Sequence, residues 1–177
     1  MNQDQKLYES YPVGTVLTAN LLSLATYTIG AYILFQTGWI WMTLYIICIF
    51  VLEFSLYKKS CAYCFYYGKL CAFGKGKIAP FFVKRSDPNK FCERKITWID
   101  LLPQILVSLI PIGVGVYLLI QEFSLLILIL ILIPILIWLF GNPIIYGKLA
   151  CPHCKQGQIC CPASKFFKPN NKEKNEQ

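Results

Sequence analysis

The sequence predicts an all-α integral membrane protein with four transmembrane helices, arranged as two tandem two-helix repeats. Three observations predict this fold class. The 177 residues are 56% hydrophobic, with a mean hydropathy of +0.51, which is too apolar for an ordinary soluble domain. Four long apolar stretches, each close to the roughly 20 residues that a span requires, alternate with polar connections. The thiol pattern C-x2-C-x6-C occurs twice, once after the second apolar stretch and once after the fourth.

The first half, residues 1–97, begins with a polar lead, residues 1–12, which lacks the pattern of a cleavable signal peptide. We expect the first span at about 13–35 and the second at about 39–57, joined by a short uncharged turn. The second span begins at Trp39, an indole that suits the outer membrane interface.

The second half, residues 98–177, repeats this layout, with spans at about 98–120 and 123–140. Pro103 and Pro111 lie inside the third span, where they predict freed backbone carbonyls that need partners from neighbouring helices. After the fourth span, a Gly-Asn-Pro sequence either ends the helix or begins an interfacial extension.

Each half ends in a cysteine-rich basic segment, residues 58–95 in the first and 147–168 in the second, the latter followed by a polar end that we expect to be disordered. Segments of this size cannot build a hydrophobic core alone and usually rely on a metal or on disulfides. Phe81 and Phe82, which lie among basic residues, predict an apolar contact with the membrane interface beneath a basic rim.

Matches between the halves support a duplication. At an offset of 85, four residues at the end of the first span recur at the end of the third: Gly30, Tyr32, Leu34 and Gln36 match Gly115, Tyr117, Leu119 and Gln121. At an offset of 90, the cysteines Cys61, Cys64 and Cys71 match Cys151, Cys154 and Cys161. Because each half holds an even number of spans, both halves are expected to have the same orientation in the membrane.

The placement of the basic residues predicts orientation. Of the 17 Lys and Arg residues, Lys6 precedes the first span, ten lie between Lys58 and Lys95, and six lie between Lys148 and Lys174. Basic loops stay on the cytosolic side, so we expect both termini and both cysteine-rich segments in the cytosol of a cell-membrane protein. The net charge of +8 then indicates attraction to anionic head groups rather than to nucleic acid.

Eight of the nine cysteines lie in the two cytosolic segments. Because the cytosol keeps thiols reduced, clustered cysteines there indicate metal binding or redox chemistry. Two C-x2-C turns can supply four thiolates to Zn²⁺, and the compact ferredoxin run is absent, which favours zinc over an iron–sulfur cluster. The predicted metal ligands are Cys61, Cys64, Cys71, Cys92, Cys151, Cys154, Cys160 and Cys161.

Two ligand pairings are open. The repeat favours one site within each half: Cys61, Cys64, Cys71 and Cys92 in the first, and Cys151, Cys154 and Cys161 with Cys160 or His153 in the second. The alternative joins the halves: Cys61, Cys64, Cys151 and Cys154 hold one ion, and Cys71, Cys92, Cys160 and Cys161 hold another.

The predicted function is a structural metal that folds both segments into a platform for a protein partner or lipid head groups. The alternatives are a membrane iron–sulfur or dithiol redox protein and a soft-metal-ion transporter. No catalytic residues are predicted, since His153 is the only histidine and no Ser-His-Asp set can be assembled. Glu53 and Asp100, near the cytosolic ends of their spans, are expected to pair with interfacial lysines rather than to form an intramembrane site.

Overall fold

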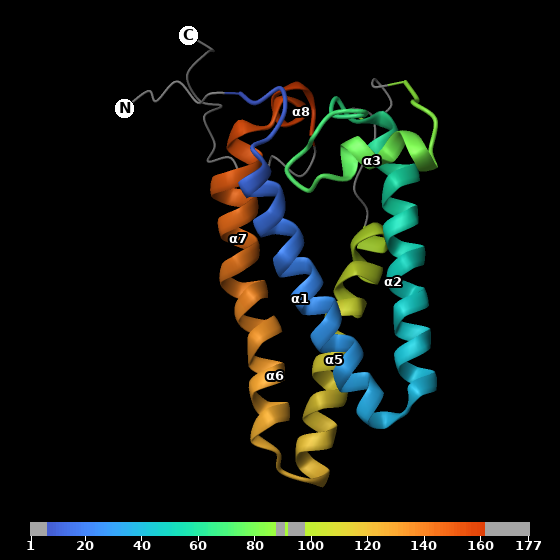
Figure 1. The fold of residues 1–177 in the computed structure, drawn as a ribbon, viewed down its shortest axis with the longest axis vertical. Helices are drawn as coiled ribbons and strands as arrows, with labels where there is room; N and C mark the ends of the chain where they lie inside the picture. The colour runs from blue at the N-terminus through green and yellow to red at the C-terminus, as the bar shows by residue number, and fades with distance from the viewer. Residues whose placement is uncertain (1–6, 88–90, 92–97, 162–177) are drawn as a thin grey trace. The chain divides into compact units, whose positions relative to one another are not determined.

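The computed structural model describes residues 7–87, 91 and 98–161. Within these residues the chain is helical, and a single isolated bridge between Tyr8 and Cys154 takes the place of any sheet (Figure 1). The prediction of an all-α fold is therefore confirmed for this part of the chain. The predicted ligand Cys92 and the polar C-terminal end lie outside the described residues.

The chain divides into two compact units. The cysteine-rich unit comprises Met1–Ala19, Tyr57–Ile96 and Asn142–Gln177, and the helical unit comprises Asn20–Leu56 and Thr97–Gly141. Segments from both halves of the sequence contribute to each unit. The two predicted repeats remain a prediction.

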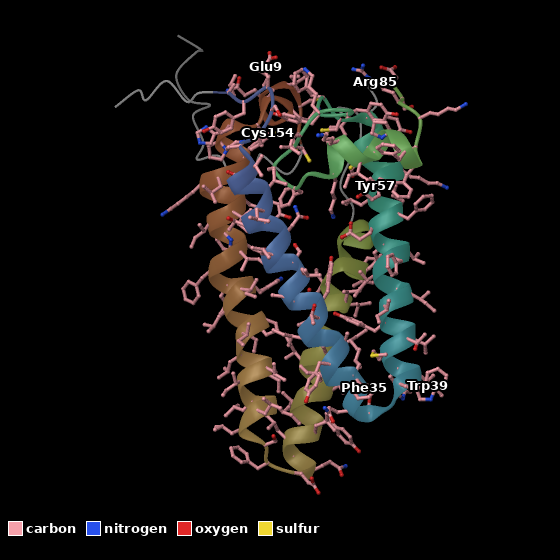
Figure 2. All side chains as sticks on the ribbon, viewed as in Figure 1. Glu9, Phe35, Trp39, Tyr57, Arg85 and Cys154 are labelled. Carbon is pink, nitrogen blue, oxygen red and sulfur yellow. The ribbon has the colours of Figure 1, made fainter. Side chains whose placement is uncertain are left out.

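The first two helices are α1 (Val13–Thr37) and α2 (Trp39–Lys59). Gly38 turns the chain between them with φ of 143°, a backbone conformation that favours glycine, and its N–H donates to the Phe35 carbonyl at 3.0 Å. Phe35 and Trp39 lie on the two sides of this turn (Figure 2). Both helices lie within two residues of the predicted bounds.

The second pair of helices is α5 (Trp98–Gln121) and α6 (Leu125–Leu136), which lie side by side in the helical unit (Figure 1). Of the two outcomes that the Gly-Asn-Pro sequence leaves open, the structure has the extension: the helical backbone continues through a wide π turn, a short α7 (Asn142–Ile144) and a second π turn that ends at Ala150. Each π turn begins within three residues after a proline, Pro134 or Pro143. Since proline removes an N–H donor, the hydrogen-bond ladder is interrupted just before each wide turn.

In the core of the helical unit, a side chain from α2 replaces the hydrogen bond that Pro111 cannot donate. Proline at position 111 has no N–H, so the carbonyl of Val107, one turn earlier, loses its helical partner. The hydroxyl of Tyr45 on α2 donates to this carbonyl at 3.1 Å. The predicted need for a partner from a neighbouring helix is thus confirmed at Val107.

Glycine at position 30 of α1 makes this joint possible. A Cβ atom there would lie 2.4 Å from the Tyr45 hydroxyl oxygen and 2.9 Å from Cγ of Pro111. Gly30 therefore lets α1 approach α2 and α5 at the point where the Tyr45 hydroxyl caps the Val107 carbonyl.

Among the described residues, three helices are long and apolar enough to cross a membrane: Val13–Thr37, Trp39–Tyr63 and Leu125–His153. Large apolar side chains on them face outward, among them Leu24, Phe50 and Leu125, each more than half exposed. Such surfaces suit lipid and not water. The fold therefore indicates a membrane protein. The fourth long helix, α5, has 24 residues, and its described part includes the apolar stretch Ile105–Gln121. The fourth span, the repeats and the orientation remain predictions.

Candidate thiol site

The two C-x2-C motifs have the same backbone conformation. Cys61–Tyr63 and Cys151–His153 are both single turns of 3₁₀ helix. In each, the N–H of the second cysteine, Cys64 or Cys154, donates to the carbonyl of the first at 3.3 Å. The second cysteine then adopts an extended conformation, with φ of −79° at Cys64 and −86° at Cys154. Both motifs thus project their second sulfur from equivalent turns.

Backbone N–H groups point at the sulfurs that these turns project. The Cys64 sulfur accepts the N–H of Tyr66, and the Cys154 sulfur accepts N–H groups from α8 (Lys155–Ile159). The third cysteine of the first motif, Cys71, accepts the N–H of Gly76 at 3.3 Å. Hydrogen bonds of this kind favour the thiolate form, the form that binds a metal.

Burial of the sulfurs opposes formation of the thiolate. It raises the pKa of Cys64 to about 12. The neighbouring sulfurs of Cys154, Cys71 and Cys61 add to this increase, and the hydrogen bond from the Tyr66 N–H reduces it. Burial likewise raises the pKa of Cys154, and Cys161 adds to that increase. These sulfurs therefore stay protonated at neutral pH unless a cation replaces their protons.

The thiols from the two halves pack against one buried cluster, which consists of Tyr11, Tyr66, Ala72 and Ala150 and which we call the tyrosine cluster. Cys64 and Cys71 contact it from the first half and Cys154 from the second. The Tyr11 backbone N–H donates to the Leu70 carbonyl at 2.9 Å, and its hydroxyl donates to the Ala150 carbonyl at 2.5 Å. Tyr11 thereby joins the two cysteine-rich segments.

Further hydrogen bonds join the two turns directly. The N–H of Phe65, next to Cys64, donates to Oε1 of the buried Gln156 at 2.8 Å. The N–H of Lys155, next to Cys154, donates to the Tyr66 hydroxyl at 3.1 Å. The two C-x2-C turns are therefore neighbours in the fold although 90 residues separate them in the sequence.

The N-terminal lead takes part in this contact. The Tyr66 hydroxyl donates to the Tyr8 carbonyl at 2.6 Å, and the Tyr8 N–H donates to the His153 carbonyl at 3.1 Å. Glu9, labelled in Figure 2, pairs with Lys155 at the surface. The hydrogen bond from that lysine lowers the pKa of the Glu9 carboxyl. The N-terminal lead therefore forms hydrogen bonds with both cysteine turns and helps to join the two halves.

Several predicted ligands are not brought into one coordination group. Among the described residues, no three His, Cys, Asp or Glu side chains form a group that could hold a metal ion. Cys160 is disulfide-bonded. The ring of His153 contacts that of Tyr8, with 4.7 Å between centroids.

Of the two carboxylates singled out in the predicted spans, the structure describes the side chain of Glu53. The Tyr27 hydroxyl on α1 donates to the Glu53 carboxylate at 3.2 Å inside the helical unit. Glu53 thus has a partner on a neighbouring helix, which the sequence had not indicated. The side chain of Asp100 lies outside the described residues.

Sequence reasoning missed the residues that join the two turns, namely Tyr8, Tyr11, Tyr66 and Gln156. Two tyrosines three residues apart in a short lead are a weak signal of a packed segment. No local pattern indicates that Gln156 bonds to a loop of the other half.

Together these features define the class: a helical protein with membrane-type helices and a cysteine-rich unit in which thiols from both halves pack against one buried cluster. No family model, no curated protein and no solved structure matches the chain.

Proposed function

We propose that the chain is a multi-pass protein of the cell membrane whose cysteine-rich unit binds zinc on the cytosolic side. In this proposal the metal is structural and stabilises a platform for lipid head groups and a protein partner. The single observation that carries the proposal is the joint packing of two equivalent C-x2-C turns, through Cys64 and Cys154, on the tyrosine cluster.

The neighbouring positions of the turns favour a site that joins the halves. The hydrogen bonds from Phe65 to Gln156 and from Lys155 to Tyr66 hold the second cysteines of the two turns in one region. We therefore place one zinc ion among four thiolates, two from each turn: Cys61, Cys64, Cys151 and Cys154. The metal itself would close this group, since each sulfur must lose its proton and approach to about 2.3 Å from the ion.

Elemental analysis tests the proposal most simply. Protein purified in detergent with a reductant is expected to contain zinc in proportion to chain, and Cys64→Ser or Cys154→Ser to lose it. Cys48→Ser is the matched control, because Cys48 lies exposed on α2 in the helical unit. A folded chain without zinc would reject the proposal, and bound iron with absorption at about 400 nm would indicate an iron–sulfur protein instead.

A dithiol redox protein is the second candidate. The disulfide at Cys160 and the packing of Cys64, Cys71 and Cys154 around one cluster favour it. Reversible formation of a disulfide between Cys64 and Cys154 in the purified chain, with no metal bound, would support this candidate over the zinc platform.

A further inference from the structure

A short helix in the cysteine-rich unit, α3 (Lys75–Phe82), presents apolar side chains outward. Phe81 is 86% exposed, Phe82 55% and Ile78 45%. The opposite face of the helix is buried at Gly76 and Ala79. The largest apolar groups of α3 therefore lie where a soluble surface would place polar ones.

Close contacts fix this orientation. A Cβ atom on Gly76 would lie 2.3 Å from the Tyr66 carbonyl oxygen and 2.6 Å from that of Lys69, so the helix backbone packs directly on the loop. The Gly76 carbonyl accepts the Gly68 N–H at 2.9 Å, and the Tyr67 hydroxyl donates to the Val83 carbonyl at 2.7 Å. Because both ends of α3 are tied to the loop, the helix cannot rotate to bury its phenylalanines.

A ring contact between α3 and the end of α2 indicates how deep α3 lies relative to the membrane. Phe82 stacks on Tyr57, with 5.4 Å between ring centroids and 29° between planes. Tyr57 lies in the last turn of α2, directly before Lys58 and Lys59 (Figure 2). Since basic residues and tyrosine mark the end of a span at the membrane interface, the contact places α3 at interfacial depth.

The basic residues around α3 indicate which kind of surface its exposed apolar face contacts. Lys77 within the helix and Lys84 and Arg85 just after it are exposed, and the lysines that end α2 are exposed as well. Aromatic side chains beneath a basic rim are the pattern of an interfacial segment on an anionic membrane.

We propose that α3 is an interfacial anchor, whose Phe81 and Phe82 insert at the head-group and acyl boundary of an anionic lipid monolayer while Lys77, Lys84 and Arg85 contact lipid phosphates. The inference rests on the proposed function only in that α2 spans a membrane; it does not require zinc.

A depth measurement with the full chain tests this anchor. Phe81→Trp is reconstituted in nanodiscs with about 30% anionic phosphatidylglycerol, whose acyl chains are brominated near the glycerol end. The quenching of the added indole is obtained by subtraction of the parent chain, which has four tryptophans. Asp87→Trp, at an exposed position of the same segment, is the matched control.

We expect quenching at position 81 to exceed that at position 87 by about two-fold or more, since an interfacial helix buries its apolar face and leaves the following loop in water. Equal quenching at the two positions would overturn the anchor. Zinc content of the same samples separates the two proposals: zinc with equal quenching rejects the anchor alone, and unequal quenching without zinc rejects the zinc platform alone.

Two further experiments identify what the apolar face of α3 contacts. Replacement of phosphatidylglycerol by phosphatidylcholine is expected to reduce quenching at position 81, and Lys84→Gln with Arg85→Gln is expected to remove this dependence on lipid charge. A photoreactive benzoylphenylalanine in place of Phe81 is expected to form lipid adducts. Cross-linking to a second copy of the chain or to another protein, or quenching that ignores lipid charge, would overturn the proposal.

Discussion

The hydroxyl of Tyr45 donates a hydrogen bond to the carbonyl of Val107 at 3.1 Å, and this bond joins two helices at the point where Pro111 interrupts one of them. Tyr45 is only 5% exposed and Val107 only 6%. In a medium without water, a carbonyl that loses its helical donor needs such a partner. The bond is therefore a specific requirement of this sequence and not a general feature of helix packing.

Tyr45→Phe is expected to destabilise the helical unit by about 1 kcal/mol, because the Val107 carbonyl would lose its donor while the ring keeps its packing. The midpoint of unfolding in a detergent titration measures the change. Tyr32→Phe, at an exposed position of α1, is the control and should be neutral. Equal midpoints for the two variants would show that the bond contributes nothing.

Gly30→Ala is expected to cost about 1–3 kcal/mol, since the added methyl would overlap Tyr45 and Pro111 in a packed joint. The same titration measures it. Gly113→Ala on α5 is the matched control, because a Cβ there meets no atom within 4 Å. If Gly30→Ala were as stable as Gly113→Ala, the close approach of the helices at Gly30 would be disproved.

Tyr11→Phe removes the hydroxyl that donates to the carbonyl of the buried Ala150. We expect a loss of about 1–3 kcal/mol in the cysteine-rich unit and faster alkylation of Cys154, which packs on the tyrosine cluster. Mass spectrometry of timed iodoacetamide labelling measures the rate. An unchanged rate at Cys154 would argue against Tyr11 as the link between the halves.

Stability of the metal-free chain should fall as pH rises from about 9 toward 12. Burial raises the pKa of Cys64 to about 12 from an ordinary value near 9, so above pH 9 the unfolded state loses a proton that the folded state retains. The free energy of unfolding therefore decreases with pH in this window. The burial that raises the pKa of Tyr66 to about 12 acts with the same sign.

Denaturant titrations at pH 8 and pH 10.5, with a chelator present, measure this dependence. Cys64→Ser is expected to reduce the pH dependence, whereas Cys48→Ser is not. A pH-independent midpoint, or equal behaviour of the two variants, would contradict the buried, protonated state of Cys64.

The predicted orientation has its own test. A membrane-impermeant maleimide added to intact cells should leave Cys61 and Cys151 unlabelled, and should label both once the membrane is opened and metal is removed. The reason is that basic segments remain on the cytosolic side. Labelling from outside intact cells would reverse the assignment of both termini.

Local signals in the sequence were sufficient to predict the helices and the turns. The uncharged Gln-Thr-Gly sequence predicted the turn at Gly38, and the C-x2-C spacing predicted two equivalent cysteine turns. Pro111 predicted an acceptor in need of a donor, because the loss of a backbone N–H follows from the residue type alone.

The long-range contacts could not be predicted in this way. The bonds of Tyr11 with Ala150 and of Phe65 with Gln156 join residues 139 and 91 positions apart, and a single sequence contains no signal for which distant carbonyl a tyrosine will meet. At Pro143 the sequence left two outcomes open, an end of the helix or an extension, and the structure has the extension. There, wide turns accommodate a proline that can also end a helix.

X-ray absorption at the zinc edge, on the full chain purified with a reductant, tests the central claim most directly. The account predicts a shell of four sulfur atoms at about 2.3 Å from the zinc ion, which is lost when Cys64 of the first turn or Cys154 of the second is replaced by serine. A shell of oxygen or nitrogen without sulfur, or a fully folded chain that holds no zinc, would contradict it.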